Sequence, residues 1–200
     1  LGAFTHDIGK PEVTKLIEGR IRSKGHSEAG LKYIEEVLSA LGLDSFVREV
    51  VPLVRFHKEP YVFYVARESD EKNGDGKFRK LARAVHPATL EYLSYVTEAD
   101  MAGRGPFPEG AHIKQSDARV WFRGEAKRLC ILDKEPIDII SGNELIPLGF
   151  KPGPVFGLLI RGANALQDDF GWTKEKILEA FKACPEVVAC ETVDDVVRSL

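Results

Sequence analysis

Apolar residues recur at the spacing of an α-helix along most of the chain, and this period restricts the possible folds more than any other feature. One stripe with i, i+3, i+4, i+7 spacing runs through Ala29, Gly30, Tyr33, Ile34, Val37 and Leu41. Further helical stripes cover residues 46–57 and 90–100. With 200 residues and 44% hydrophobic content, the chain can bury one sizeable core. We therefore predict an all-α fold that is stabilised by helix packing.

The helical pattern is interrupted at ILDKEPIDII, residues 131–140. We predict an all-helical body over residues 1–130 and a small helical tail domain over residues 131–200, joined through this segment. One continuous body is the alternative. Within the body, the charged, glycine-bearing segment at 68–77 predicts an exposed loop. In the tail, a tight turn at 149–154 precedes an amphipathic helix with Pro154 in its first turn.

Imidazole and carboxylate groups occupy helix ends and apolar stripes in the body. His6 and Asp7 stand side by side after a short apolar stretch, His26 begins a helical stripe, and His57 and Asp100 extend two others. Any one of them alone is more often a hydrogen-bonded core residue than a ligand. Buried without partners, however, such groups are costly, and a divalent cation satisfies both kinds at once. The set therefore predicts a metal site.

The mixture of nitrogen and oxygen ligands without thiolate narrows the choice of ion. It favours Mn, Fe, Co, Ni or Zn over Ca, and Mg is possible if waters complete its shell. Such an ion lowers the pKa of a water bound to it and polarises a phosphoryl oxygen. The predicted chemistry is therefore hydrolysis of a phosphoester.

The segments HDIGKP, GRIRSKGHSEAG, VRFHKEP and TEADMAGR occur in this order in roughly the first hundred residues. Together they resemble the HD superfamily of metal-dependent phosphohydrolases. The resemblance implies an HD-domain helical bundle in which His6, Asp7 and Asp100 bind the metal, with Asp7 able to bridge two ions. It also implies a further metal-binding histidine some tens of residues before the doublet. The sequence begins too close to the doublet to include it and lacks an initiator Met, so we expect a fragment of a longer chain.

The same resemblance implies three catalytic residues around the substrate. His26 and His57 match extra histidines that bind a second ion or contact the phosphate, and Lys10 would lie near the phosphate as a point charge. Arg104 follows Asp100 by one helical turn, which places it to reach a phosphate held by the metal. We therefore include Arg104 as a substrate-binding candidate.

Most of the chain also resembles the C-terminal region of bacterial CCA-adding tRNA nucleotidyltransferases, in several of which an HD domain follows the polymerase head. The similarity lies in the segments GHSEAGLKYIEEVLSALGLDSFVREVVPLVRFH, EADMAGR and SGNELIPLGFKPGPVFGLLIRGANALQ. The catalytic half with its strand-borne carboxylates is absent from these residues, so CCA addition is not expected of them alone. A standalone HD phosphohydrolase with a related tail is the alternative.

Two basic regions are candidates for contact with tRNA. In the tail, Lys151 and Arg161 flank a glycine-bearing loop and a helix N-terminus that could bind an RNA phosphate. A plain helix-turn-helix packing unit fits this segment equally well, and residues 131–200 hold seven Lys or Arg against twelve Asp or Glu. In the body, residues 114–128 could contact phosphates through Lys114, Arg119, Arg123, Lys127 and Arg128. The alternative is a helix face that is exposed to solvent and binds no RNA.

Charge and hydropathy exclude several other classes of protein. A net charge of −3 and a pI of about 6.0 provide no global basic field for nucleic acid. The longest apolar runs are too short to span a bilayer and no signal peptide begins the chain, which predicts a cytoplasmic protein without a membrane partner. Cys130, Cys184 and Cys190 lack CxxC spacing and are expected to be free, buried thiols.

These features together predict a divalent-metal-dependent phosphohydrolase. Its substrate would be a phosphoester or nucleotide, either a phosphomonoester or a 2',3'-cyclic phosphodiester. The alternative is a non-catalytic body and tail that hold the tRNA for a nucleotidyltransferase.

Overall fold

The protein is described by a computed structural model that covers residues 1–67, 74–103 and 111–200, with only the backbone described for residues 111–116. Most of these residues are helical, and a two-stranded antiparallel sheet is the only sheet among them. The predicted all-α class is thus confirmed as a mostly helical fold. The HD-domain identity stays a prediction.

The contacts of the chain divide it into two units. One comprises residues 1–69 and 81–135, and the other comprises residues 70–80 and 136–200. The predicted boundary after residue 130 lies near the division after residue 135, but the grouping of residues 70–80 with the tail was not predicted. Residues 74–77, expected in a loop, instead begin helix α6 (Gly74–Val85). The earlier part of that predicted loop, residues 68–73, lies outside the described residues.

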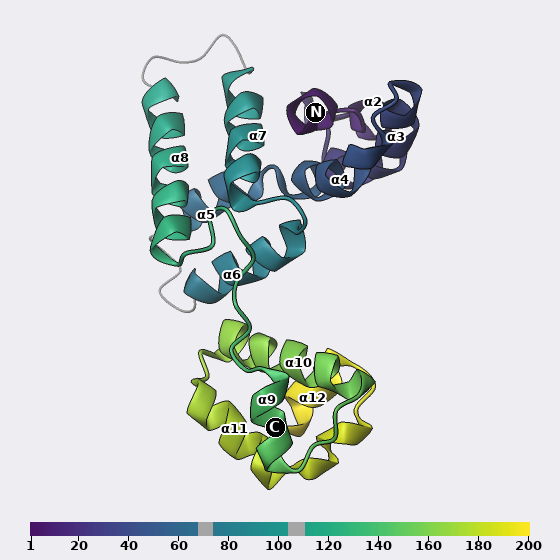
Figure 1. Cartoon of the computed structure of the whole chain (residues 1–200). Coiled ribbons are helices and arrows are strands. Elements are labelled where there is room, and N and C mark those ends of the chain that lie inside the picture. Colours follow the sequence, from purple (N-terminus) through teal and green to yellow (C-terminus); the bar gives the residue numbers. More distant parts are fainter. Residues whose placement is uncertain (68–73, 104–110) are drawn as a thin grey trace. The chain divides into compact units, whose positions relative to one another are not determined.

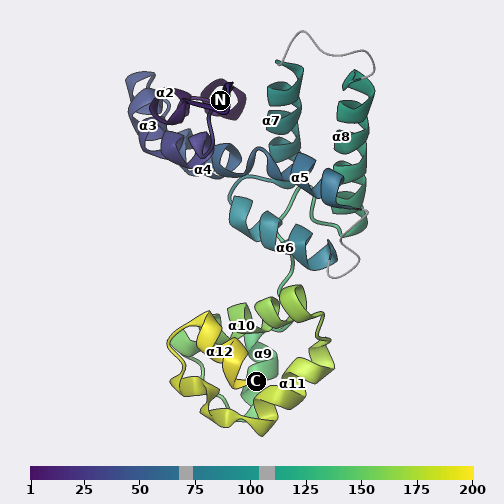
Figure 2. The same ribbon diagram turned by 180° about the vertical axis from the view of Figure 1, so that it is seen from behind.

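The first unit brings its N-terminal helices against a later helix pair. Figures 1 and 2 show α7 and α8 side by side, and α1 contacts both α4 and α7. Helix α5 packs on α7 and α8, and α3 packs on α2 and α4. Besides the two strands and the end of α6, the elements are α1 (Gly2–Thr5), α2 (Lys10–Val13), α3 (His26–Ala40), the 3-10 turn η1 (Asp44–Phe46), α4 (Val47–Phe56), α5 (Glu59–Ala66), α7 (Leu90–Ala102) and α8 (Ala111–Arg128).

The predicted apolar stripes account for the packing of α3 against α4. Ile34 and Leu38 of α3 meet Val50 and Val54 of α4, and none of the four is more than 3% exposed. Full burial of such a side chain stabilises the fold by roughly 1.5–3 kcal/mol. His57 continues the α4 stripe at 0% exposure, as the sequence predicted. The stripe therefore carries an imidazole into the interior of the unit.

Residues 15–22 form a β-hairpin that the helical reading of the sequence did not predict. Strand β1 (Lys15–Ile17) pairs with β2 (Arg20–Arg22), and Leu16 lies opposite Ile21. The connection is the two-residue turn Glu18–Gly19, with φ values of 51° and 73°. Positive φ at both positions is the property of a type I′ turn, which matches the twist of paired strands. The sequence signal was the glycine at residue 19, in the turn between the two short strands.

Gly9 allows the chain after the His6–Asp7 doublet to pass directly under α3. A Cβ atom at residue 9 would lie 2.2 Å from the carbonyl oxygen of His26 and 2.4 Å from the backbone nitrogen of Gly30. Both distances are far shorter than any real contact, so a side chain at residue 9 would push α3 away. The glycine therefore sets how closely the start of α3 approaches the doublet.

The second unit has a core of its own. Phe150 and Phe181 meet edge to face with ring centroids 6.1 Å apart. Helix α10 begins at Pro154, as predicted, where a missing backbone N–H leaves no hydrogen bond unmade. The elements from residue 136 onward are α9 (Gly142–Leu145), the 3-10 turn η2 (Ile146–Leu148), α10 (Pro154–Phe170), α11 (Lys174–Ala183), the 3-10 turn η3 (Pro185–Ala189) and α12 (Val193–Ser199).

The three cysteines are free thiols in the structure. Cys184 and Cys190 are half-buried, whereas Cys130 is exposed, so the prediction that it is buried is wrong. Cys130 has a φ of 57° in the turn that ends α8, where the chain leaves the helix.

Among the described residues, no helix is both long enough and apolar enough to cross a membrane.

Candidate metal centre

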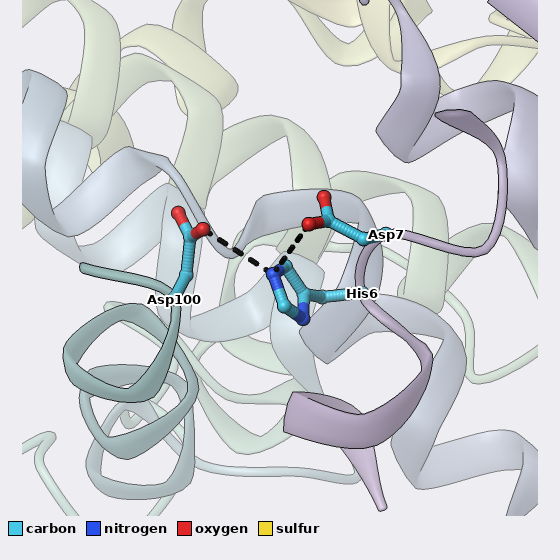
Figure 3. A group of neighbouring side chains, drawn as sticks. All are labelled: His6, Asp7 and Asp100. Carbon is cyan, nitrogen blue, oxygen red and sulfur yellow. Dashed lines mark hydrogen bonds and ion pairs between the residues drawn. The ribbon is translucent and has the colours of Figure 1, made fainter. Parts of the chain in front are cut away.

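Three side chains from two distant segments meet where α1 approaches α7. His6 and Asp7 directly follow α1, and Asp100 lies in the last turn of α7. His6 Nε2 lies 3.2 Å from Asp7 Oδ2 and 3.2 Å from Asp100 Oδ1. Figure 3 shows both carboxylates directed at the same nitrogen of the imidazole ring. One ligand atom of each residue lies within 4.8 Å of the others, so the three predicted metal ligands do converge.

His26 and His57 complete a cluster around these three residues. The His57 ring centroid lies 5.2 Å from that of His6 and 5.5 Å from that of His26. His26 Nε2 also lies 3.2 Å from Asp7 Oδ1. The structure therefore brings five predicted site residues together, from the ends of α1, α3, α4 and α7.

Each of the three imidazoles is anchored through its Nδ1 atom. In His6, His26 and His57 alike, Nδ1 lies 2.7 Å from the carbonyl oxygen of the residue three positions earlier. A carbonyl oxygen only accepts hydrogen bonds, so Nδ1 must be the protonated nitrogen. In the neutral ring Nε2 then carries a lone pair, and this is an atom that binds metal ions. In metal-binding histidines, the ring nitrogen that does not bind the metal typically donates to a backbone carbonyl or a carboxylate, which fixes the orientation of the ring.

Three buried atoms of the cluster have no hydrogen-bond partner among the described residues. They are Asp7 Oδ1, His26 Nε2 and His57 Nε2. His26 Nε2 and Asp7 Oδ1 lie 3.2 Å apart, but both are acceptors in the neutral tautomer, so their closeness is not a hydrogen bond. A buried acceptor without a partner costs about 1–3 kcal/mol. A cation between Asp7 Oδ1 and His26 Nε2, which lie 3.2 Å apart, would satisfy both of these atoms.

The surroundings shift the pKa values of the three histidines in different directions. The hydrogen bond to Asp100 raises the pKa of His6. Burial lowers the pKa of His26, and it lowers the pKa of His57 to about 4. At neutral pH, His26 and His57 are therefore neutral rings with Nε2 available. His6 keeps its proton to higher pH, and metal binding would have to displace it.

The donor set fits a divalent transition metal. Imidazole nitrogen with carboxylate oxygen suits Mn, Fe, Co, Ni or Zn, and Mg would need waters to complete its shell. A hydrogen bond between helices supports the position of these donors. The Thr97 hydroxyl donates to the His57 carbonyl oxygen at 2.5 Å. This contact fixes the end of α4 against α7, which holds two ligand-bearing elements in register.

A cavity of about 600 Å³ opens beside the cluster, and its lining includes His26 and Asp100. Lys10, predicted to act near the substrate, lines it and lies 2.5 Å from Asp7 Oδ2. Lys58 also lines it, with Nζ 3.4 Å from the His26 ring. The cavity wall is therefore rich in positive charge, which suits an anionic substrate.

The lining residues Arg22, Lys24 and Lys58 were not predicted as site residues. Arg22 and Lys24 lie in the segment GRIRSKGHSEAG, and Lys58 lies in VRFHKEP. Lys24 lies two residues before His26, and Lys58 directly follows His57. Their closeness in sequence to His26 and His57 was thus the signal that could have identified Lys24 and Lys58.

The remaining predicted site residues lie elsewhere. Arg104 is outside the described residues. Arg123 donates to Glu91 at 2.6 Å and lies over the Tyr95 ring, so its guanidinium is engaged within the α7–α8 pair. Lys151 and Arg161 are exposed in the second unit. Contact of Lys151, Arg161 or Arg123 with RNA stays a prediction.

The chain matches no family model, no curated protein and no solved structure. The resemblances to HD phosphohydrolases and to the nucleotidyltransferase C-terminal region therefore stay predictions. The cluster and the cavity beside it stand on their own geometry.

Proposed function

We propose that the first unit is a divalent-metal-dependent phosphohydrolase with His6, Asp7 and Asp100 as ligands. The observation that supports this most is the inward-facing set of buried acceptor atoms without hydrogen bonds, beside carboxylates 3.2 Å from an imidazole. Mn, Fe, Co, Ni or Zn fits the donors, with Mg as a further possibility. The bound ion would supply polarisation of a phosphoryl oxygen and an acidified water.

The residues around the cavity suit a phosphoester. Lys10 and Lys58 provide positive charge where charge develops on phosphoryl oxygens during hydrolysis. His57, with its pKa near 4, is neutral at physiological pH and serves as a ligand or acceptor rather than as an acid. His26 faces the cavity and the Asp7 carboxylate together. We therefore propose phosphomonoesters and 2',3'-cyclic phosphodiesters of nucleotides as substrates. The location that we propose for the protein is the cytoplasm.

The direct test is phosphate release or ring opening with nucleoside 2'- and 3'-monophosphates and 2',3'-cyclic nucleotides. The metal-free protein is assayed with Mn²⁺, Co²⁺, Ni²⁺, Fe²⁺, Zn²⁺ or Mg²⁺ added back singly. We expect turnover in the wild type with at least one ion and none in Asp7→Ala. Glu49→Ala is the matched control, because it removes an exposed carboxylate from α4 in the same unit. Circular dichroism checks that each variant is folded.

Two results would contradict the phosphohydrolase. One is unchanged turnover in Asp7→Ala, and the other is a wild type that hydrolyses none of these substrates with any ion. In the second case, filter binding of tRNA across a salt series tests the non-catalytic alternative. That alternative requires an affinity that falls steeply with salt.

A further inference from the structure

The β1–β2 hairpin has two chemically different faces. Directly opposed residues of an antiparallel pair share a face, and residues two apart on one strand do so as well. Leu16 and Ile21 therefore lie on one face. Lys15, Arg20 and Arg22 lie on the other face together with Ile17, because Lys15 is opposite Arg22, Arg20 is two positions from Arg22, and Ile17 is opposite Arg20. We call this second set the basic face.

The basic face is not neutralised within the protein. Lys15, Arg20 and Arg22 make no ion pair with any described residue, and neither does Lys24 just beyond β2. The only acid of the hairpin, Glu18 at the turn, also pairs with none of them. Other cations of the unit do have carboxylate partners, for example Lys32 with Glu12, Arg55 with Glu28 and Arg119 with Glu98.

The arrangement of the basic face is unfavourable in the absence of an anion. Lys15 and Arg22 face each other directly across the ladder, and like charges in that position destabilise a strand pair. Both strands are exposed along their whole length, so no core packing offsets this repulsion. An anion that bridges the two strands would remove it.

The basic face is continuous with the candidate active site. Arg22 and Lys24 line the same cavity as Lys10, His26 and Asp100. Lys15 and Arg20 are not among the residues that line the cavity, but they share the face of Arg22. Positive charge therefore extends from the cavity wall along the hairpin.

We propose that the basic face binds the phosphate backbone of a single-stranded oligonucleotide whose terminal phosphoester lies in the cavity. This inference rests on the proposed phosphohydrolase function and narrows its substrate to the end of a nucleic-acid strand. A free nucleotide has no further phosphates in a chain, so it leaves Lys15 and Arg20 without a partner. Contacts to phosphates without base recognition also predict binding that is independent of sequence.

Binding is tested without turnover, by fluorescence anisotropy of a labelled single-stranded oligonucleotide with a 3'-phosphate in the presence of EDTA. In the wild type, the logarithm of the affinity falls with the logarithm of salt concentration. In Lys15→Gln/Arg20→Gln, we expect weaker binding and a slope shallower by about 1.4, because each phosphate contact contributes roughly 0.7 on a single strand. A slope equal to that of the wild type overturns the proposal.

Two controls separate the basic face from general charge and from the fold of the hairpin. Arg48→Gln/Lys134→Gln removes two exposed charges from the first unit, one on α4 and one in the segment that follows α8. Leu16→Gln alters the opposite face of the hairpin, where Leu16 is 74% exposed. Both controls should keep the slope of the wild type. If the slope in either control becomes as shallow as in Lys15→Gln/Arg20→Gln, the assignment of strand binding to this face is refuted.

Hydrolysis separates the failure of this inference from that of the proposed function. With the activating metal, Lys15→Gln/Arg20→Gln should raise KM for the 3'-phosphorylated oligonucleotide and leave kinetics on a nucleoside 3'-monophosphate unchanged. An equal effect on both substrates overturns the inference while the phosphohydrolase stands. If the wild type turns over neither substrate but the salt slope still responds to the double change, the phosphohydrolase fails and the strand-binding face stands.

Discussion

The buried imidazole of His57 makes the metal-free first unit sensitive to acid. Burial lowers the pKa of His57 from 6.5 to about 4, so between these values the unfolded chain binds a proton that the folded chain does not. Stability therefore rises with pH across this interval. With these two pKa values, a fall from about pH 7.5 to about pH 5 removes roughly 2 kcal/mol from the free energy of unfolding.

The neighbouring histidines do not hide this effect. Burial also lowers the pKa of His26, which adds to the loss on acidification. The pKa of His6 is raised, so its stabilising contribution is complete below pH 6.5 and is lost as pH rises through its folded value. His6 therefore opposes the effect of His57 only above pH 6.5, in the upper part of this range.

The assay is urea unfolding in EDTA at a series of pH values. Trp172→Phe leaves Trp121 on α8 as the sole tryptophan, so fluorescence reports the first unit. In this background, His57→Gln replaces the imidazole with a polar group that does not titrate. We expect its stability to depend less on pH than that of the His57 protein, by roughly the 2 kcal/mol derived above. Identical pH dependence in the two proteins would show that His57 is not buried as a neutral ring.

Two further predictions concern metal binding. Mn²⁺, Co²⁺ or Ni²⁺ should raise the melting temperature of the wild type, since an ion at 100 times its Kd stabilises by about 2.7 kcal/mol, and EDTA should reverse the rise. In Asp100→Asn the rise should be lost, whereas Glu98→Gln on the same helix should keep it, and equal rises in both would exclude Asp100 as a ligand. Because the pKa of His6 is raised, metal binding should release a proton, and its calorimetric heat should depend on the ionisation enthalpy of the buffer. A heat that is independent of the buffer would show that metal binding does not remove the proton of His6.

The helices and the convergence of the cluster could be predicted because they follow from periodicity. The stripe that includes Ile34 continues from His26, and the stripe that includes Val54 ends at His57. Apolar faces pack inward, so polar residues that extend those faces are carried to the same interior. Asp100 extends an apolar stripe of α7 in the same way, and it is 6% exposed.

The hairpin and the cavity wall could not be predicted in the same way. Residues 15–22 are exposed on both strands, so no buried face imposes an alternation of apolar and polar residues. Only the turn at Gly19 marked the hairpin in the sequence. Lys58 and Arg22 line one cavity because of tertiary packing, and no local pattern specifies which cations meet.

The contact between His6 and Asp100 joins residues 94 positions apart in the chain. A metal ion held by this pair would therefore tie the opening helix of the first unit to one of its last, much as a cross-link closes a long loop. The unfolded chain offers only the adjacent doublet, so tight occupancy would report that the whole unit has assembled. Catalytic competence and structural integrity would then be lost together, because a single coordination sphere serves both.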